Sequence, residues 1–129
     1  MEDINNNQKK IMIVEDDTIS LDFLVNYFSE TFIVEKAEDG IRALKKLENF
    51  IPDIILLDNI MPHMTGHELI KILKNDYRYK NIPIIMFSAD DNIGERSGCL
   101  GLGIEGYIVK PMNLSDLKKE INNVLYKGA

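Results

Sequence analysis

Apolar and polar residues follow two different spacings along this chain, and the two spacings alternate. Short apolar runs rich in Ile and Val are typical of strands that are buried on both faces. Between the runs, an apolar residue recurs at every third or fourth position, which is the spacing of one helix face. The runs predict strands at residues 11–14, 33–36, 54–57, 82–87 and 104–109.

The helical stretches begin and end at recognisable signals. The first predicted helix covers roughly residues 18–30. Asp39 and the glycine after it turn the chain into a second helix, which ends before Pro52 because the residue before a proline disfavours helical geometry. A third helix begins where Thr65 and Glu68 match a capping box, in which each side chain bonds to the backbone N–H of the other residue.

The last two helical stretches differ in quality. The segment from 90 to 103 predicts only a short, easily frayed helix, since each interior glycine costs a helix up to about 1 kcal/mol relative to Ala. Its glycines are Gly94, Gly98, Gly101 and Gly103. By contrast, residues 114–126 predict a regular helix, with Asn113 as its N-cap and a continuous apolar face.

Strict alternation of strands and helices predicts the fold class. A helix after each of five strands requires a parallel sheet of five strands, with right-handed crossovers and helices on both faces. Residues 1–9 are polar and rich in Asn, and we read them as a flexible lead-in. Residues 10–127 then form one α/β domain, with no internal repeat or linker.

Composition narrows the classes of function. Of the 129 residues, 45% are hydrophobic and 28% are charged, which is typical of a folded globular domain. The net charge of −6 argues against a nucleic-acid or membrane-surface partner, because both need clustered positive charge. No apolar stretch is long enough to cross a bilayer and the start does not resemble a signal peptide, so we expect a cytoplasmic protein. Cys99 is the only cysteine, and we expect it to serve as a small packing residue.

Acidic residues stand where two of the predicted strands end. Glu15 and Asp16 follow the first strand, and Asp58 follows the third. In open parallel sheets the carboxyl ends of the strands form the ligand-binding edge. Two unit charges about 4 Å apart repel by roughly 4 kcal/mol at an effective dielectric of 20, so a cation must join them. Lys110, after the fifth strand, supplies one positive charge, and Mg²⁺ fits the two negative charges left over. We assign the neighbouring Asp17 to the N-cap of the first helix instead.

These residues resemble the signature of response regulator receiver domains of two-component signalling. The resemblance covers the chain from residue 10 to 126, and the positions that carry it are Glu15-Asp16, Asp58, Met61-Pro62, Gly66, Ser88-Ala89 and Lys110-Pro111. The resemblance implies a flavodoxin-like (βα)5 fold, a doubly wound sheet with strand order 2-1-3-4-5. It also implies a signalling domain that promotes only its own phosphorylation and dephosphorylation, rather than an enzyme with a separate substrate.

The resemblance assigns a phosphoacceptor and a metal site. Asp58 would take a phosphoryl group from a phosphohistidine on a sensor histidine kinase or a histidine phosphotransfer protein. Mg²⁺, or Mn²⁺ in its place, would be held by Asp16, Asp58 and the backbone carbonyl of Ile60, and by Glu15 through water. A carboxylate is a competent nucleophile when a metal orients it and withdraws charge from the incoming group.

The same resemblance assigns the phosphoryl-binding and switch residues. Lys110 and Ser88 would stabilise the phosphoryl oxygens, and Ala89 is small enough to admit the group. Ser88 and Tyr107 would then switch a protein-binding surface on the fourth helix, fifth strand and fifth helix. An unidentified downstream protein would read that surface.

Several positions stay open at this stage. The resemblance places Asn59, Ile60 and Asp90 at positions that would tune how fast the phosphoryl group is lost, so the phosphorylated lifetime is left open. Asp90 either orients a hydrolytic water or caps the fourth helix. His63 and His67 are read as surface residues, because no second nitrogen or sulfur ligand accompanies them in the sequence.

Two other functions would use some of the same residue types. A haloacid dehalogenase-type phosphatase also uses an Asp nucleophile at a strand tip, but needs a second Asp two residues later, where this chain has Ile60. A receiver-like module that only binds proteins would not need the full set of site residues. Whether the domain stands alone or belongs to a hybrid kinase or a longer regulator is not fixed by the sequence.

Overall fold

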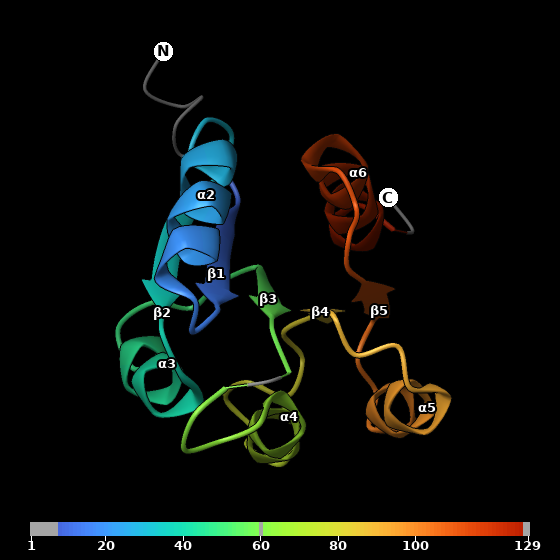
Figure 1. Cartoon of the computed structure of the whole chain (residues 1–129). Coiled ribbons are helices and arrows are strands. Elements are labelled where there is room, and N and C mark those ends of the chain that lie inside the picture. The colour runs from blue at the N-terminus through green and yellow to red at the C-terminus, as the bar shows by residue number, and fades with distance from the viewer. Residues whose placement is uncertain (1–7, 60, 128–129) are drawn as a thin grey trace.

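Five parallel strands form one sheet at the centre of the molecule (Figure 1). The computed structural model describes residues 8–59 and 61–127. The strand order is β2-β1-β3-β4-β5, which confirms the predicted doubly wound arrangement. The strands are β1 (Lys10–Val14), β2 (Ile33–Ala37), β3 (Ile54–Leu57), β4 (Ile84–Ser88) and β5 (Gly106–Val109).

Helices cover both faces of the sheet. Figure 1 shows α2 and α6 on one side and α3, α4 and α5 on the other. Their bounds are α2 (Thr18–Phe28), α3 (Gly40–Leu47), α4 (Gly66–Lys74), α5 (Ile93–Gly101) and α6 (Leu114–Leu125). None of these helices combines the length and the apolar character that crossing a bilayer requires.

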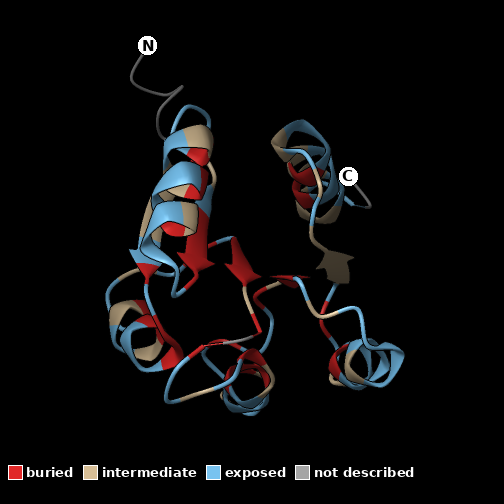
Figure 2. Ribbon diagram, in the orientation of Figure 1, coloured by how far each residue is buried: buried red, intermediate tan, exposed pale blue. Residues whose placement is uncertain are grey.

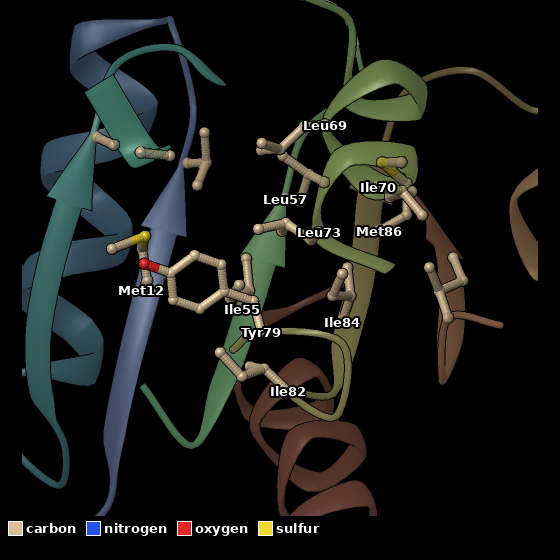
Figure 3. Close-up of a cluster of buried hydrophobic side chains, with 14 of the residues drawn as sticks. Met12, Ile55, Leu57, Leu69, Ile70, Leu73, Tyr79, Ile82, Ile84 and Met86 are labelled. Atoms are coloured by element: carbon tan, nitrogen blue, oxygen red, sulfur yellow. The ribbon is translucent and has the colours of Figure 1, made fainter. Parts of the chain in front are cut away.

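The buried residues form two cores, one on each face of the sheet (Figure 2). Successive side chains of a strand point to opposite faces, so β1 gives Ile11 and Ile13 to one core and Met12 and Val14 to the other. The core under α2 and α6 also contains Phe28. The core under α3, α4 and α5 is drawn in Figure 3, where the side chains of α4 lie against those of β3 and β4.

Most helix starts confirm the predicted caps. Asp17 accepts a hydrogen bond from the backbone N of Ser20 at 2.9 Å, which places it at the start of α2 as expected. Thr65 and Glu68 form the predicted capping box of α4. Asn113 caps α6.

The start of α5 resolves one of the open alternatives. Its N-cap is Asn92, whose side chain accepts from the N–H of Glu95. Asp90 is therefore not the cap of this helix, although its carboxylate accepts a hydrogen bond from the backbone N of Asn92 at 2.9 Å. The helix ends before Gly103, which adopts φ +96, a conformation that favours glycine at a helix C-terminus.

Three element boundaries lie two residues away from the predicted ones. The helix predicted over residues 18–30 ends at Phe28. The strand predicted at 82–87 begins at Ile84, because Pro83 has no N–H to give to the ladder; its carbonyl still accepts from Ile55 at 2.9 Å. The strand predicted at 104–109 begins at Gly106. The expected lead-in over residues 1–9 stays a prediction, because residues 1–7 lie outside the described part of the chain.

Gly66 fixes how closely α4 approaches the end of β3. A Cβ added there would lie 2.8 Å from the Cα of Asn59 and 2.8 Å from the carbonyl oxygen of Asp58. The N–H of Gly66 also donates to the carbonyl of Asn59 at 2.9 Å. Both contacts are with backbone, so a side chain at this position would push the helix away from the strand tip.

We expect Gly66→Ala to lower the free energy of unfolding by about 1–3 kcal/mol, the usual cost of an overpacked site. The matched control is Gly101→Ala, since nothing lies within 4 Å of a Cβ at that position. Alanine there should leave stability unchanged or raise it by up to about 1 kcal/mol. Urea unfolding of both variants measures the difference, and equal stabilities would contradict the close approach at Gly66.

Candidate functional site

Three carboxylates converge at the carboxyl ends of β1 and β3. The two strands pair in parallel with Val14 opposite Leu57, so the residues that follow emerge side by side. The N–H of Asp58 donates to the carbonyl of Val14 at 3.0 Å and extends this register by one residue. Glu15, Asp16 and Asp58 each offer an oxygen, and these oxygens lie within 4.8 Å of one another. The structure thus brings together the three predicted acidic residues.

Lys110 adds a cation to this acidic cluster from the end of β5. Its Nζ lies 3.0 Å from Oε1 of Glu15, whose side chain is only 5% exposed. The other carboxylate oxygen of Glu15 accepts from the backbone N of Asp17 at 3.1 Å. The buried carboxylate therefore has a partner on each oxygen, which offsets the cost of removing it from water.

Electrostatics favours a further cation at the acidic cluster. The pKa of Asp16 is raised, first by partial desolvation of its carboxyl and then by the negative charge of Glu15. A raised pKa means that the ionised carboxyl is disfavoured where it stands, and a bound cation would reverse this. Three carboxylates against the Lys110 ammonium leave an excess of negative charge, and hard oxygen donors are the ligands that Mg²⁺ prefers. The donor set fits such an ion; the carbonyl of Ile60, the fourth expected ligand, lies outside the described residues.

Ser88 and Tyr107 are joined through the backbone of Asp90. The Ser88 side chain, at the end of β4, is fully buried, and its Oγ accepts from the N–H of Asp90 at 3.1 Å. The phenol of Tyr107 donates to the carbonyl of the same residue at 2.8 Å. Burial is the main cause of the raised pKa of Tyr107, so the phenol is a neutral donor. A movement of the Ser88 hydroxyl would therefore reach Tyr107 through the backbone of a single residue, Asp90.

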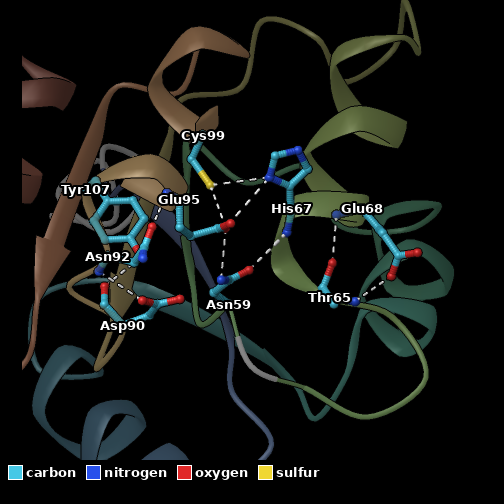
Figure 4. A network of polar contacts seen from close by, with 9 residues as sticks. All are labelled: Asn59, Thr65, His67, Glu68, Asp90, Asn92, Glu95, Cys99 and Tyr107. Carbon is cyan, nitrogen blue, oxygen red and sulfur yellow. Dashed lines mark hydrogen bonds and ion pairs between the residues drawn. The ribbon is translucent and has the colours of Figure 1, made fainter. Parts of the chain in front are cut away.

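Asn59 ties the end of β3 to two helices, as Figure 4 shows. Its Nδ2 donates to Oε2 of Glu95 on α5 at 2.9 Å, and its Oδ1 accepts from the backbone N of His67 on α4 at 3.2 Å. The residue is 8% exposed, so these bonds satisfy a buried amide. Sequence reasoning singled out Asn59 only as a position that tunes phosphoryl loss, and it missed this structural role.

His67 is not the isolated surface residue that the sequence predicted. Its Nδ1 lies 3.6 Å from Oε2 of Glu95 and 3.8 Å from the sulfur of Cys99, both on α5. The prediction was wrong because the partners come from a helix that is distant in sequence. One signal was available: Glu95 and Cys99 are four residues apart, the spacing of neighbours on one helix face. His63 is exposed, as expected.

Cys99 is fully buried, which confirms its expected packing role. Its thiol also donates to Oε2 of Glu95 at 3.2 Å. Burial, followed by the hydrogen bond to and the charge of Glu95, raises the pKa of the thiol to about 12. The thiol is therefore neutral at pH 7 and a poor nucleophile as it stands.

Comparison with known proteins gives a consistent result. A family model described as the response regulator receiver domain matches residues 11–122. The Regulator of RpoS from Escherichia coli K12 is 34% identical over 122 residues, which cover 92% of this chain but only 35% of that protein. Other relatives named as histidine kinases are longer still, and the chain covers 8–9% of their length.

Solved structures of similar chains share the whole fold. A CheY-like response regulator receiver domain protein from Methanospirillum hungatei has a TM-score of 0.86 and 31% identity, covering 92% of this chain and 94% of that one. The phosphorylated cyanobacterial phytochrome response regulator RcpA has a TM-score of 0.83 and 27% identity, covering 95% and 96%.

Proposed function

Because this chain belongs to the response regulator receiver domain family of two-component systems, we propose that it accepts a phosphoryl group on Asp58 and switches a protein-binding surface in response. The observation that carries the proposal is the convergence of Glu15, Asp16 and Asp58 with Lys110 at one sheet edge. The relatives named as histidine kinases support a phosphohistidine donor, on a sensor kinase or on a histidine phosphotransfer protein. The structural likeness to a phosphorylated response regulator supports the same chemistry.

The transfer requires little covalent chemistry from the protein. A carboxylate oxygen of Asp58 forms the new P–O bond, while the P–N bond of the donor breaks and its electron pair returns to the imidazole nitrogen. The rate then depends on how well the protein stabilises the oxygens of the phosphoryl group in the transition state. Lys110 can offer a compact ammonium and Ser88 a hydroxyl to those oxygens, since both lie at the same edge of the sheet as Asp58, at the carboxyl ends of β5 and β4.

We propose that Glu15, Asp16 and Asp58 hold the Mg²⁺ that this chemistry needs. When bound, the ion neutralises phosphoryl charge and orients the nucleophile. Asp16 is the exposed member of the acidic cluster and Glu15 the buried one, already engaged by Lys110. Asp16 therefore stands as a direct ligand, and Glu15 as one that acts through water. Mn²⁺ suits the same oxygens.

The central experiment is incubation with acetyl phosphate and Mg²⁺ followed by intact-mass measurement. The wild-type protein should gain one phosphoryl group, and Asp58→Asn should gain none, because an amide cannot form the acyl phosphate. Chelation of the metal should abolish the gain in the wild type. Steady hydrolysis of a small phosphate ester would instead indicate a phosphatase, and the absence of any adduct would indicate a module that only binds proteins.

Asp16 and Asp17 offer a matched pair for testing the metal site. We expect Asp16→Asn to weaken Mg²⁺ binding at least about tenfold. Two unit charges about 4 Å apart interact by roughly 4 kcal/mol at an effective dielectric of 20, and a tenfold change in affinity corresponds to about 1.4 kcal/mol. Asp17→Asn keeps a good N-cap for α2 and should bind Mg²⁺ as the wild type does. Isothermal titration measures both affinities. Equal loss in the two variants would point to a general charge effect and not to ligation by Asp16.

The switch follows from the charge that phosphorylation brings. A phosphoryl group adds about −1.5 to −2 charges at pH 7, which would draw the hydroxyl of Ser88 and the ammonium of Lys110 toward it. Ser88 would then release the N–H of Asp90, and the carbonyl of that residue is the acceptor of Tyr107. The surface that changes comprises α5, β5 and α6, and we propose that it binds the downstream protein.

Hydrogen exchange tests this switch directly. Beryllofluoride, which mimics the phosphoryl group, should change the amide exchange of residues 93–103 in the wild type, since the first turn of α5 begins just after Asp90. The same treatment of Asp58→Asn should leave the exchange unchanged. Indistinguishable exchange in treated and untreated wild-type protein would rule out a response of α5.

A further inference from the structure

We propose that His67, Glu95 and Cys99 form a binding site for a divalent transition-metal ion of the zinc type, which joins α4 to α5. These three side chains have no part in the proposed phosphoryl chemistry, and the site shares no residue with the acidic cluster. The inference stands on their geometry and does not rest on the proposed function.

Three donor atoms of different chemistry surround a position from which a metal ion would be at bonding distance to all three. Nδ1 of His67, Oε2 of Glu95 and Sγ of Cys99 form a triangle with edges of 3.6, 3.2 and 3.8 Å. A triangle with these edges has a circumradius of about 2.1 Å, so an ion at or just above its centre is about 2.1–2.3 Å from all three atoms. Zinc lies about 2.0–2.1 Å from a histidine nitrogen, 2.0–2.2 Å from a carboxylate oxygen and 2.3 Å from a thiolate sulfur. Very little movement is needed to reach those distances.

The donor set selects the class of ion. Imidazole nitrogen and thiolate sulfur suit zinc and related transition metals, whereas Mg²⁺ and Ca²⁺ take oxygen ligands. Three protein ligands leave the fourth tetrahedral position open to water or to a group from a partner. On binding, the thiol of Cys99 gives its proton to solvent, because a thiol that coordinates zinc is deprotonated outright.

The ligands are held in place and the ion has a way in. Glu95 and Cys99 lie one turn apart on α5, while His67 lies in the first turn of α4, so all three stand on regular helices. Figure 4 shows the imidazole and the carboxylate pointing toward the sulfur. The His67 and Glu95 side chains are 30% and 25% exposed, so an ion can enter between them and meet the buried sulfur behind.

Asn59 supports the site from behind the ligands. Its side chain donates to the same oxygen of Glu95 that faces the other two donors, and it accepts from the backbone N–H of His67. A ligating carboxylate is commonly oriented by such a hydrogen bond, and the loss of the partner typically weakens metal binding about 10- to 100-fold.

Cobalt provides a probe specific to this site. Co²⁺ bound to a thiolate gives a sulfur-to-metal charge-transfer band, and Cys99 is the only cysteine of the chain, so the band can arise at no other place. We expect reduced wild-type protein in excess Mg²⁺, which occupies the acidic cluster, to develop the band up to one equivalent of Co²⁺. One equivalent of Zn²⁺ should displace it.

Variants separate ligation from simple thiol binding. Cys99→Ser should remove the band. His67→Ala, which removes a ligand, and Glu95→Gln, which removes the charge of a ligand, should each weaken Co²⁺ binding by more than about tenfold. His63→Asn is the control, because it removes the other histidine while tolerating the φ of 69 found there, and it should bind as the wild type does. Circular dichroism confirms that each variant is folded. No band in the wild type, or equal affinity in folded His67→Ala, would overturn the proposal, and neither result bears on phosphorylation of Asp58.

Discussion

The pairing of β1 with β3 is the constraint on which the rest of the structure depends. Its register forces the side chains after Val14 and after Leu57 to the same place, and those side chains are acidic. Such proximity opposes folding, because like charges this close repel by several kcal/mol. Lys110 offsets part of this repulsion: it follows β5, which two strands of the sheet separate from β1, and its ammonium contacts the buried carboxylate of Glu15. The crowding that costs stability is also what would attract a cation to this edge, and the proposed phosphoryl transfer depends on that cation.

Two chains of hydrogen bonds leave this edge, and both lead to the region around α5. One runs from Asn59, next to Asp58, to Glu95 within the helix. The other runs from Ser88 through the backbone of Asp90, which lies just before α5 in the chain, to Tyr107 on β5. A change of charge at Asp58 can therefore reach α5 from two strands. The helix α5 contributes little to the core, because Cys99 is its only buried residue. Little packing therefore opposes its movement.

The sequence was sufficient for the sheet and for the acidic cluster, but not for the contacts between helices. Strand periodicity and chain direction place Glu15, Asp16 and Asp58 at one edge without any knowledge of side-chain packing. The boundary at Pro83 was missed because the periodicity of apolar residues ignores which backbone groups can pair. The environment of His67 was missed for a deeper reason: whether α4 and α5 bring their side chains together depends on how both helices lie over the sheet. No local pattern encodes that distance.

The burial of a single thiol has a practical consequence for studying motion in this domain. Cys99 faces inward from α5 and is covered completely. A thiol-modifying reagent is larger than a metal ion and should react with Cys99 only when α5 moves away from its neighbours, so the rate of labelling under native conditions reports how often that happens. Cys99 is thus a natural probe for local unfolding of α5, the element that is expected to respond to signalling. No cysteine has to be introduced by mutation.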